Sequence, residues 1–488
     1  MAATKALKEV GLETRLFIDG KYVEASTSAR ISCFSPEDDS LITDDIHKAV
    51  REDIDCAVAA ARRAFPSWSC TTAAQRAEKL MKLASLIEEH ADQLALLEAA
   101  CNGKPLQVFH GFEKVVARDV YRYYAGWCGK LGGESFPDDD ASGLLKITKR
   151  QPLGVCAAIV AFNGPIAVMA FKVAPCLAAG NTIIVKASEK SPLSSLYFGK
   201  LANEAGIPPG VINFVSGDGE TGSLLAHHMQ IDMISFTGST STGKRITEAA
   251  ARSNLKKVTL ELGGKSPSII FPDADLELAV KWCVNGIAIL SGQECCASSL
   301  VYVHEDIKAQ VVEQMKKGFE ALQGCYGDSL SQTTAFPPLV DKAQYKSVAS
   351  FIEDGKANAT LVTGGERLFD KGCWIQPTIF VDPLPNAKVH KEEIFGPVVV
   401  ISSFTNEEEV IEWTNKSAYG LHSAVFTQDI NRAMRMTERL STGTVCVNCC
   451  AIANINVPFG GLRQSGWGRE LGREGIEEYT QIKTVLIK

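Results

Sequence analysis

The middle of the chain alternates between short apolar runs and segments in which apolar residues recur at helical spacing. Continuous apolar strands separated by helices are typical of a parallel sheet that is covered on both faces. The pattern therefore predicts an α/β fold from about residue 152 onward. The predicted strands are 155–160, 181–185, 211–215, 233–236 and 258–262, and the predicted helices are 165–178, 193–204, 222–228 and 241–251.

Regions on either side add further elements. Thr72 and Gln75 have the spacing of a capping box, which marks a helix start. Gly263-Gly264 marks a hinge, after which the strand–helix cycle restarts. Two α/β units in one chain place a cleft between them, where such folds bind ligands. The elements predicted here are strands at 16–18 and 268–271 and helices at 53–65, 72–100 and 276–290.

Composition and charge narrow the functional classes. The chain has 488 residues, 45% apolar and 22% charged, which suits a soluble protein with a substantial core. The net charge of −7 argues against a nucleic acid or an anionic membrane as the partner. Fifteen cysteines, an odd number, do not fit a secreted disulfide scaffold. The first ten residues lack a secretory signal pattern and no apolar run has transmembrane length, so a reduced cytoplasmic protein is expected.

Two glycine turns follow predicted strands and precede predicted helices. Residues 217–222 fit G-x-G-x-x-G, which suits either a dinucleotide or a tight turn. Gly238-Ser239 opens the next helix, whose exposed N–H groups suit a pyrophosphate, although Ser239 can also be an ordinary helix cap. Lys186 and Glu189 lie just past a strand end, so they either bind a ribose or belong to the solvated surface.

Three side chains near the ends of predicted elements offer catalytic chemistry. Cys295 follows a long apolar helix and a glycine, so it is either an accessible thiolate or one of many small buried cysteines. Glu261 ends a buried strand and is either a paired carboxylate or a base at a cleft. Asn163 either donates to an oxyanion or caps the following helix. No ligand spacing predicts a metal site.

Several motifs stand in one order along the chain. They are Val258-Thr-Leu-Glu261-Leu-Gly-Gly-Lys-Ser-Pro267, Gly292-Gln-Glu-Cys295, Glu393-Ile-Phe-Gly-Pro397, and Pro458-Phe-Gly-Gly461 with Ser465-Gly466 and Gly468-Arg-Glu-Leu471. With these motifs the chain, from about residue 16 to residue 488, resembles the aldehyde dehydrogenase superfamily of the NAD(P)-dependent, non-acylating type.

The resemblance implies oxidation of an aldehyde to the carboxylic acid with NAD. Cys295 would be the nucleophile that forms a thiohemiacetal and then a thioester. The Asn163 side chain and the Cys295 backbone amide would hold the oxyanion, and Glu261 would activate the hydrolytic water. Lys172 and Glu470 match the family's proton-relay positions.

On the cofactor side, the resemblance assigns Lys186 and Glu189 to the adenosine ribose, Ser239 to the pyrophosphate and Glu393 to the nicotinamide ribose. An acidic residue at 189 accepts from a ribose 2′-hydroxyl and repels a 2′-phosphate, so NAD is favoured over NADP, although Lys186 weakens the preference. The remaining cofactor positions are Gly219, Phe236, Gly238, Leu262 and Phe395.

The family architecture implies a Rossmann-like cofactor domain at 1–131 and 152–262 and an α/β catalytic domain at 263–465. Residues 132–151 and 466–488 would form a β oligomerisation arm and a C-terminal tail. A homodimer or homotetramer is expected, with a small-molecule aldehyde as the substrate and no nucleic-acid or membrane partner.

The sequence departs from the family pattern around the substrate. Gly164, Ile289 and Ala453 stand where the family often has aromatic rings. Losing rings opens volume, so we expect a wide pocket that accepts a bulky aldehyde. Phe171 and Phe459 would remain as its apolar walls.

Two residues beside Cys295 are unusual. Glu294 either points into the substrate tunnel, where it would favour a cationic or hydroxylated aldehyde, or is a paired charge inside the protein. Cys296 is either a plain small residue or a thiol that captures an oxidised Cys295 and protects it. The strain of a vicinal disulfide ring favours the first interpretation. Cys449-Cys450 is a similar pair near the expected tunnel mouth.

Two rival functions remain open. A CoA-acylating relative would hand its thioester to coenzyme A, but Glu261 argues for hydrolysis, because such members can dispense with a base for water. A catalytically idle relative, serving as a structural or binding protein, is opposed by the presence of Cys295, Asn163 and the cofactor residues.

Overall fold

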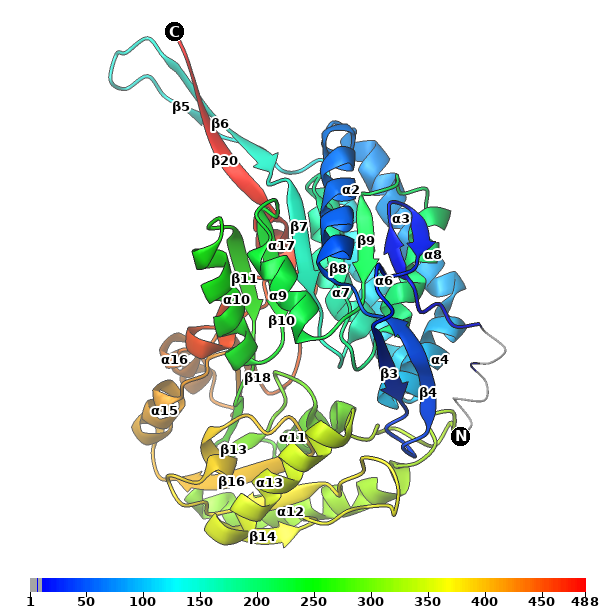
Figure 1. Cartoon of the computed structure of the whole chain (residues 1–488). Helices are drawn as coiled ribbons and strands as arrows, with labels where there is room; N and C mark the ends of the chain where they lie inside the picture. The colour runs from blue at the N-terminus through cyan, green and yellow to red at the C-terminus, as the bar shows by residue number, and fades with distance from the viewer. Residues whose placement is uncertain (1–6, 8–10) are drawn as a thin grey trace.

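The first large sheet carries the predicted parallel strands at its centre (Figure 1). The computed structural model describes residue 7 and residues 11–488. Strands β11, β10, β7, β8 and β9 run parallel in this spatial order, with antiparallel β19 at one edge and β1 and β2 at the other. The bounds are β1 Leu16–Ile18, β2 Lys21–Val23, β7 Val155–Ile159, β8 Thr182–Lys186, β9 Ile212–Val215, β10 Met233–Thr237, β11 Lys257–Glu261 and β19 Gly466–Trp467.

The direction of winding changes at β7. From β7 the chain proceeds to β8 and β9 on one side and then returns to build β10 and β11 on the other. The connection after β7 therefore leads toward β8, whereas the connection after the neighbouring β10 leads the opposite way, toward β11. The two connections diverge and leave a crevice at the carboxyl ends of β7 and β10. Open α/β sheets bind ligands at such a switch point.

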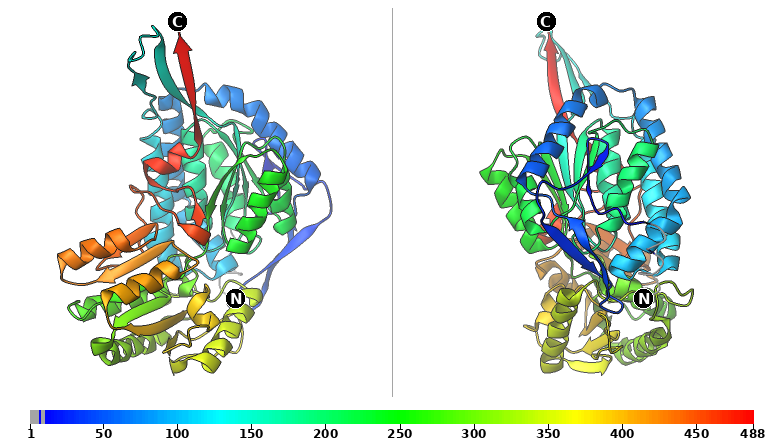
Figure 2. Two further views of the ribbon diagram at one scale, coloured as in Figure 1. Left: turned by 90° about the vertical axis from the view of Figure 1, so that its left-hand side faces the viewer. Right: turned by 45° about the vertical axis from the view of Figure 1, so that its right-hand side comes forward.

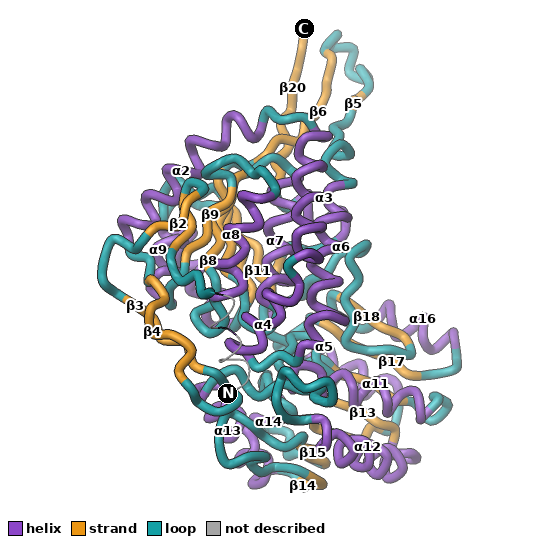
Figure 3. Tube along the Cα trace, turned by 90° about the vertical axis from the view of Figure 1, so that its right-hand side faces the viewer, coloured by secondary structure: helices purple, strands orange, loops and turns teal. Residues whose placement is uncertain are grey.

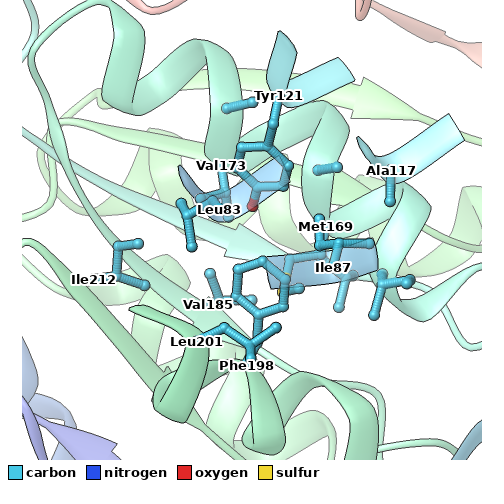
Figure 4. Packing of buried hydrophobic residues seen from close by; sticks show 14 of the residues in the cluster. Leu83, Ile87, Ala117, Tyr121, Met169, Val173, Val185, Phe198, Leu201 and Ile212 are labelled. Carbon is cyan, nitrogen blue, oxygen red and sulfur yellow. The ribbon is translucent and has the colours of Figure 1, made fainter. Parts of the chain in front are cut away.

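Helices cover both faces of this sheet, because successive strand residues point to opposite sides. Cys156 and Ala158 of β7 join the core with α3, α6, α7 and α8, which Figure 4 shows, whereas Val155 and Ala157 join the core with α2, α9 and α10. The bounds are α2 Arg51–Ser69, α3 Ala73–Glu89, α4 Ala91–Asn102, α5 Leu106–Val108, α6 Lys114–Ala125, α7 Pro165–Ala178, α8 Leu193–Glu204, α9 Gly219–His227 and α10 Thr240–Arg252.

The second large sheet is built from residues after Ser266 and has the strand order β14-β15-β16-β13-β12-β17-β18. All neighbours are parallel except β14 and β15. Helices α11 and α12 pack on one face, and α13, α15 and α16 pack on the other. The strands are β12 Pro267–Ile270, β13 Leu300–His304, β14 Thr360–Thr363, β15 Thr378–Val381, β16 Val398–Phe404, β17 His422–Phe426 and β18 Thr444–Val447, and the helices are α11 Leu276–Ala288, α12 Lys308–Leu322, α13 Lys342–Asn358, α14 Lys388–Lys391, α15 Glu407–Lys416, α16 Ile430–Arg439 and α17 Gly472–Glu477.

A narrow antiparallel sheet projects away from the body of the molecule (Figures 1 and 2). It consists of β5 (Ser135–Phe136), β6 (Leu145–Pro152) and the C-terminal β20 (Thr480–Ile487). Another hairpin, β3 (Arg30–Phe34) with β4 (Leu41–His47), reaches toward the second unit (Figure 3). There the Cys373 N–H donates to the carbonyl of Pro36 at 2.8 Å.

The strands and helices predicted between residues 152 and 262 are confirmed within three residues at each end. The capping box is confirmed as well: the Gln75 N–H donates to Thr72 Oγ1 at 3.3 Å and the Thr72 N–H donates to Gln75 Oε1 at 2.9 Å. No helix in the described residues is long and apolar enough to cross a membrane. Residues 1–6 and 8–10, which carried the expectation of no secretory signal, lie outside the described residues.

One predicted helix is divided in two, and another ends two residues early. The single helix expected over 72–100 breaks at His90, which separates α3 from α4. The His90 ring forms hydrogen bonds with Tyr197 Oη at 2.9 Å and Glu204 Oε2 at 3.2 Å, both on α8. This contact with α8 stabilises the chain at the point where the helix is interrupted. The helix expected over 276–290 ends at Ala288, since Leu290 is left-handed with φ +46°.

Candidate active site

The predicted site residues gather at one edge of the first sheet. Asn163 follows β7, Lys186 ends β8, Gly238 follows β10 and Glu261 ends β11. Carboxyl ends of parallel strands share one edge, so these residues line the crevice beside the switch point.

The segment that carries Cys295 enters from the second unit through a strained turn. Leu290, Ser291 and Gly292 have φ values of +46°, +53° and +71°, so consecutive residues are left-handed. Such strain costs about 1–3 kcal/mol for a residue other than glycine and requires support from its surroundings. At Gly292 the support is a close approach, because a Cβ there would overlap the carbonyl of Gly396. Both the Gly-Gln and the Phe-Gly-Pro motifs therefore belong to one packed contact.

The Gln293 side chain fixes the same segment. Its Nε2 donates to the carbonyls of Leu290 at 3.0 Å and Pro338 at 3.1 Å, and its Oε1 accepts from the Val340 N–H at 2.9 Å. The residue is 3% exposed, so these bonds satisfy an amide that water does not reach. A glutamine at this place thus holds the loop two residues before Cys295.

Cys295 is half-buried and lies against the end of the first sheet. A Cβ on Gly264 would overlap the Cys295 carbonyl oxygen, which explains a glycine in the Glu-Leu-Gly-Gly segment after β11. Each of the fifteen cysteines, all within the described part of the chain, is a free thiol. The thiol of Cys295 can therefore act as a nucleophile without prior reduction.

Asn163 links the two units directly. Its Nδ2 donates to the Gln293 carbonyl at 3.0 Å, two residues from Cys295. An amide nitrogen carries two hydrogens, so the second remains to donate to an oxygen that develops beside the thiol. The predicted oxyanion donor and the predicted nucleophile are thus brought together.

Glu261 is a buried carboxyl with an unsatisfied oxygen. It is 5% exposed, and its Oε2 has no hydrogen-bond partner among the described residues. Burial, together with repulsion from Glu470 and Cys295, raises the pKa of Glu261 well above its ordinary value, although Lys172 and Arg469 oppose the shift. A carboxyl in that condition suits proton transfer near neutral pH.

Lys172 on α7 connects Glu470 to the same centre. It is fully buried, its ammonium forms an ion pair with Glu470, and it donates to Ser235 Oγ at 2.9 Å. The Glu470 N–H in turn donates to the Phe459 carbonyl at 2.8 Å. The predicted relay pair is therefore in contact, and Glu470 lies close enough to Glu261 to raise its pKa.

The cofactor-side residues line the neighbouring strand ends. Ser239 caps α10 by accepting from the Thr242 N–H at 3.3 Å, and a Cβ on Gly238 would press against the Phe236 ring at 2.5 Å. Lys186 is 3% exposed and donates to Glu189 Oε2 at 3.3 Å, and burial lowers its pKa.

These groups suit a dinucleotide. A helix N-terminus offers backbone N–H groups to a diphosphate, and an ammonium paired with a carboxylate offers a donor and an acceptor to ribose hydroxyls. Two further cofactor positions lie beside them: Gly219 opens α9 with open space around its Cα, and Leu262 packs against Gly243 of α10.

Glu393 lies where the second unit meets the Gly263-Gly264 hinge. Its Oε1 accepts from the Gly264 N–H at 3.0 Å, and a Cβ on Gly263 would overlap the carboxyl group. Burial raises the pKa of Glu393 to about 7. Phe395, left-handed with φ +54°, meets the Phe162 ring edge-on at 5.7 Å between centroids.

The predicted pocket residues divide into two groups. Phe171, Phe459 and Cys296 belong to one apolar cluster together with Cys295. Ile289 and Ala453 are exposed, and Gly164 opens α7 at the foot of the same loop as Asn163.

Glu294 and Cys296 face one another. Cys296 Sγ donates to Glu294 Oε2 at 3.8 Å, and burial raises the pKa of Glu294 to about 7 against the pull of that bond and of Lys104. Contact with Cys295, burial and the Glu294 carboxyl raise the pKa of the Cys296 thiol. Glu294 is thus half-buried beside the Cys296 thiol, and its role stays a prediction.

Sequence reasoning missed several residues that hold the site. One is Asn102, whose Nδ2 donates to the Phe162 carbonyl at 3.2 Å. Glu113, in a π-helical turn (Phe109–Glu113), accepts from the first N–H groups of α7. The available signal was polar residues in an otherwise apolar helical region, which does not reveal their distant partners.

Comparison with known proteins gives one consistent result. The family model described as the aldehyde dehydrogenase family matches residues 22–485. An aldehyde dehydrogenase of Aspergillus niger is 44% identical over 96% of this chain and 94% of its own, and human retinal dehydrogenase 2 is 42% identical over 97% and 92%. The NAD+ complex of a Bacillus cereus aldehyde dehydrogenase superposes with a TM-score of 0.95 at 42% identity, covering 99% of this chain and 98% of that one.

Proposed function

The chain belongs to the aldehyde dehydrogenase family, and we propose that Cys295 is the nucleophile with which it oxidises an aldehyde to the carboxylic acid, with NAD as the oxidant. The family and its fold, expected from the sequence, are confirmed, and the chain is an NAD(P)-dependent aldehyde dehydrogenase. The observation that supports the proposal is the meeting of Cys295, Asn163 and the unsatisfied Glu261 carboxyl at the carboxyl edge of the first sheet.

The reaction begins at the Cys295 sulfur. The thiolate attacks the aldehyde carbon, a carbon–sulfur bond forms, and the carbonyl electron pair moves to oxygen. The second amide hydrogen of Asn163 and the Cys295 backbone N–H donate to that oxygen. One such preorganised donor is worth about 3–4 kcal/mol of barrier.

Bound NAD would supply the hydride acceptor that lets the oxyanion collapse to a thioester. On this chain, Ser239 and the start of α10 would hold the diphosphate, Lys186 and Glu189 the adenosine ribose, and Glu393 the second ribose. The Glu189 carboxylate repels a 2′-phosphate, which supports NAD over NADP.

Glu261 completes the cycle. Its carboxylate takes a proton from water, the hydroxyl oxygen attacks the thioester, and the carbon–sulfur bond breaks to release the acid and the Cys295 thiolate, with the proton left on Glu261. Lys172 forms an ion pair with Glu470, and the charge of Glu470 helps to raise the pKa of Glu261. These interactions support Lys172 and Glu470 as the path by which the proton leaves Glu261.

The substrate is proposed to be a bulky aldehyde. Gly164, Ile289 and Ala453 place no ring near the predicted pocket, while Phe171 and Phe459 supply apolar walls beside Cys295. A relative named for retinal, human retinal dehydrogenase 2, is consistent with a large apolar substrate in this family.

The arm is proposed to join subunits into a homodimer or homotetramer. Its strands expose Phe136, Leu145, Ile482, Leu486 and Ile487, which is unusual for a strand in water. A reducing compartment such as the cytoplasm suits the free Cys295 thiol.

A panel of aldehydes tests the proposal. Purified protein would be mixed with NAD or NADP and with acetaldehyde, aliphatic, aromatic and amino aldehydes, with NADH fluorescence as the readout. We expect best turnover on a bulky aldehyde with NAD, free acid as the product without coenzyme A, and no signal from Cys295→Ala. Best turnover on acetaldehyde would refute the wide pocket, a requirement for coenzyme A would refute hydrolysis, and no turnover at all would refute the function.

A further inference from the structure

Charged side chains lie buried beneath the loop that carries Asn163. Glu98 at the end of α4, Lys104 just beyond it and Glu113 are 1%, 2% and 2% exposed. Lys104 Nζ lies 2.6 Å from Glu98 Oε2 and also pairs with Glu113. Taking charges out of water is costly, so such a cluster persists only where its members pair closely.

This cluster of Glu98, Lys104 and Glu113 holds the loop of residues 162–167 on both sides of Asn163. Glu113 Oε1 accepts from the Ile166 and Ala167 N–H groups at 3.1 and 3.2 Å, so a carboxylate caps the positive end of α7. On the other side, the Lys104 N–H donates to Asn102 Oδ1 at 3.1 Å, and Asn102 Nδ2 donates to the Phe162 carbonyl. Asn163 stands between these anchors.

A second carbonyl contact completes the hold. Ser191 Oγ donates to the same Phe162 carbonyl at 3.2 Å. Gly164 offers no side chain for packing, and its backbone faces Glu113, since a Cβ there would lie 3.7 Å from Glu113 Oε1. The loop is thus fixed by polar bonds and charge, in addition to the contact of the Phe162 ring with Phe395.

The Asn163 loop also meets the segment that carries the nucleophile. Asn163 Nδ2 donates to the Gln293 carbonyl, two residues before Cys295, at 3.0 Å. The placement of this loop therefore bears on the distance between the thiol and the amide donor.

We propose that Glu98, Lys104 and Glu113 are positioning residues that hold the Asn163 amide at the oxyanion of the reaction. The inference rests on the proposed function. A misplacement of about 1 Å in a positioned group can cost 10²-fold in rate, so a buried charge that fixes the loop contributes to turnover without touching substrate.

The key variant is Glu113→Gln, which keeps the acceptor oxygen and the shape but removes the charge. We expect kcat to fall about 10-fold to 100-fold, with KM for aldehyde and NAD within about twofold. The effect should vanish in the Asn163→Ala background, because a positioning residue acts only through the donor that it holds. The matched control is Glu88→Gln, a carboxylate that pairs with Lys114 and Arg118 at the surface.

Hydrogen exchange supplies a readout that does not depend on turnover. In Glu113→Gln we expect faster exchange at peptides covering residues 162–168 and unchanged exchange in the second sheet. If Glu113→Gln does not fold, Glu98→Gln takes its place with the same expectations.

Three results would overturn the inference: an unchanged kcat, a loss that adds to that of Asn163→Ala, or unchanged exchange over 162–168. If the wild-type protein oxidises no aldehyde, the proposed function fails, and the exchange data alone then decide whether the charges order this loop.

Discussion

The two segments that meet at Cys295 are held by different means. Residues 290–296 are held by close backbone approaches, with Gly292 against Gly396 and Gly264 against the Cys295 carbonyl, and by the uncharged Gln293 amide. Residues 162–167 are held by hydrogen bonds and buried charge from Asn102, Ser191 and Glu113.

The difference predicts different sensitivities. A segment held by close approach rejects any added side chain, because nearby backbone cannot move aside. A segment held by charge tolerates a change of shape but responds to the loss of a charge or to the loss of its partner. Variants within each segment, and at the catalytic groups beside it, can distinguish these two kinds of sensitivity.

The largest effect is expected at Glu261, which neither segment carries. Glu261→Gln should lower steady-state kcat about 10²–10⁴-fold, because no base remains to activate water. The thioester should still form, so stopped-flow fluorescence should show a burst of NADH close to one per active site. A variant without a burst would place Glu261 before hydride transfer instead.

The pH dependence sharpens the same point. Because the pKa of Glu261 is raised, the carboxyl is protonated and idle below that pKa, so kcat should rise with pH through it. The burst amplitude should vary less over the same range. A kcat that is flat with pH while the burst persists would argue against Glu261 as the base.

The next largest effect is expected at Asn163, the proposed oxyanion donor in residues 162–167. Asn163→Ala should lower kcat about 10²–10³-fold. Loss of its bond to the Gln293 carbonyl should cost only about 1 kcal/mol in unfolding free energy. Paired kinetic and urea-denaturation measurements check this, and a large stability loss with intact kcat would contradict it.

Changes in residues 290–296, where backbone atoms approach closely, should lower the free energy of unfolding. Gly292→Ala adds a Cβ against the Gly396 carbonyl at a left-handed position, so unfolding free energy should fall about 1–3 kcal/mol. Gly219→Ala is the matched control, since its Cβ would meet nothing within 4 Å. Equal melting temperatures for the two variants would remove the basis of the comparison.

A pH dependence of stability is expected from Glu393. Its pKa is about 7 in the folded chain against 4.5 for an ordinary glutamate, so the folded state holds the extra proton between these values. Stability should therefore fall as pH rises from about 4.5 to about 7. Glu393→Gln should flatten this slope relative to the wild-type protein in denaturation at several pH values. An identical slope would show that the carboxyl is not buried in solution.

Local pattern explains which parts of the fold could be predicted. Apolar runs and capping residues act within a few positions, so the strands of the first sheet and the Thr72–Gln75 cap follow from sequence. The break at His90 does not, because its partners Tyr197 and Glu204 lie more than 100 residues away. The helix end at Ala288 likewise depends on the left-handed turn that the second unit imposes.

The candidate site divides in the same way. Cys295, Glu261 and Asn163 were identified because each lies at the end of a predicted element or in the loop after it and matches a functional position of the family, and their roles remain proposals. The groups that hold them could not be identified, since Gln293 meets Pro338 and Val340, and Glu113 meets Ile166, across 45 to 53 residues.

The sequence by itself determined the α/β fold, the family and the residues gathered at the carboxyl edge of one sheet, because periodicity and motifs are local properties of a chain. Only the tertiary structure decided at which glycines a side chain would overlap neighbouring atoms and which charges support Asn163. The reason is that Asn163 and Gln293, 130 residues apart, meet only when the regions around the two large sheets pack together. The distances that govern chemistry at Cys295 are set by that packing.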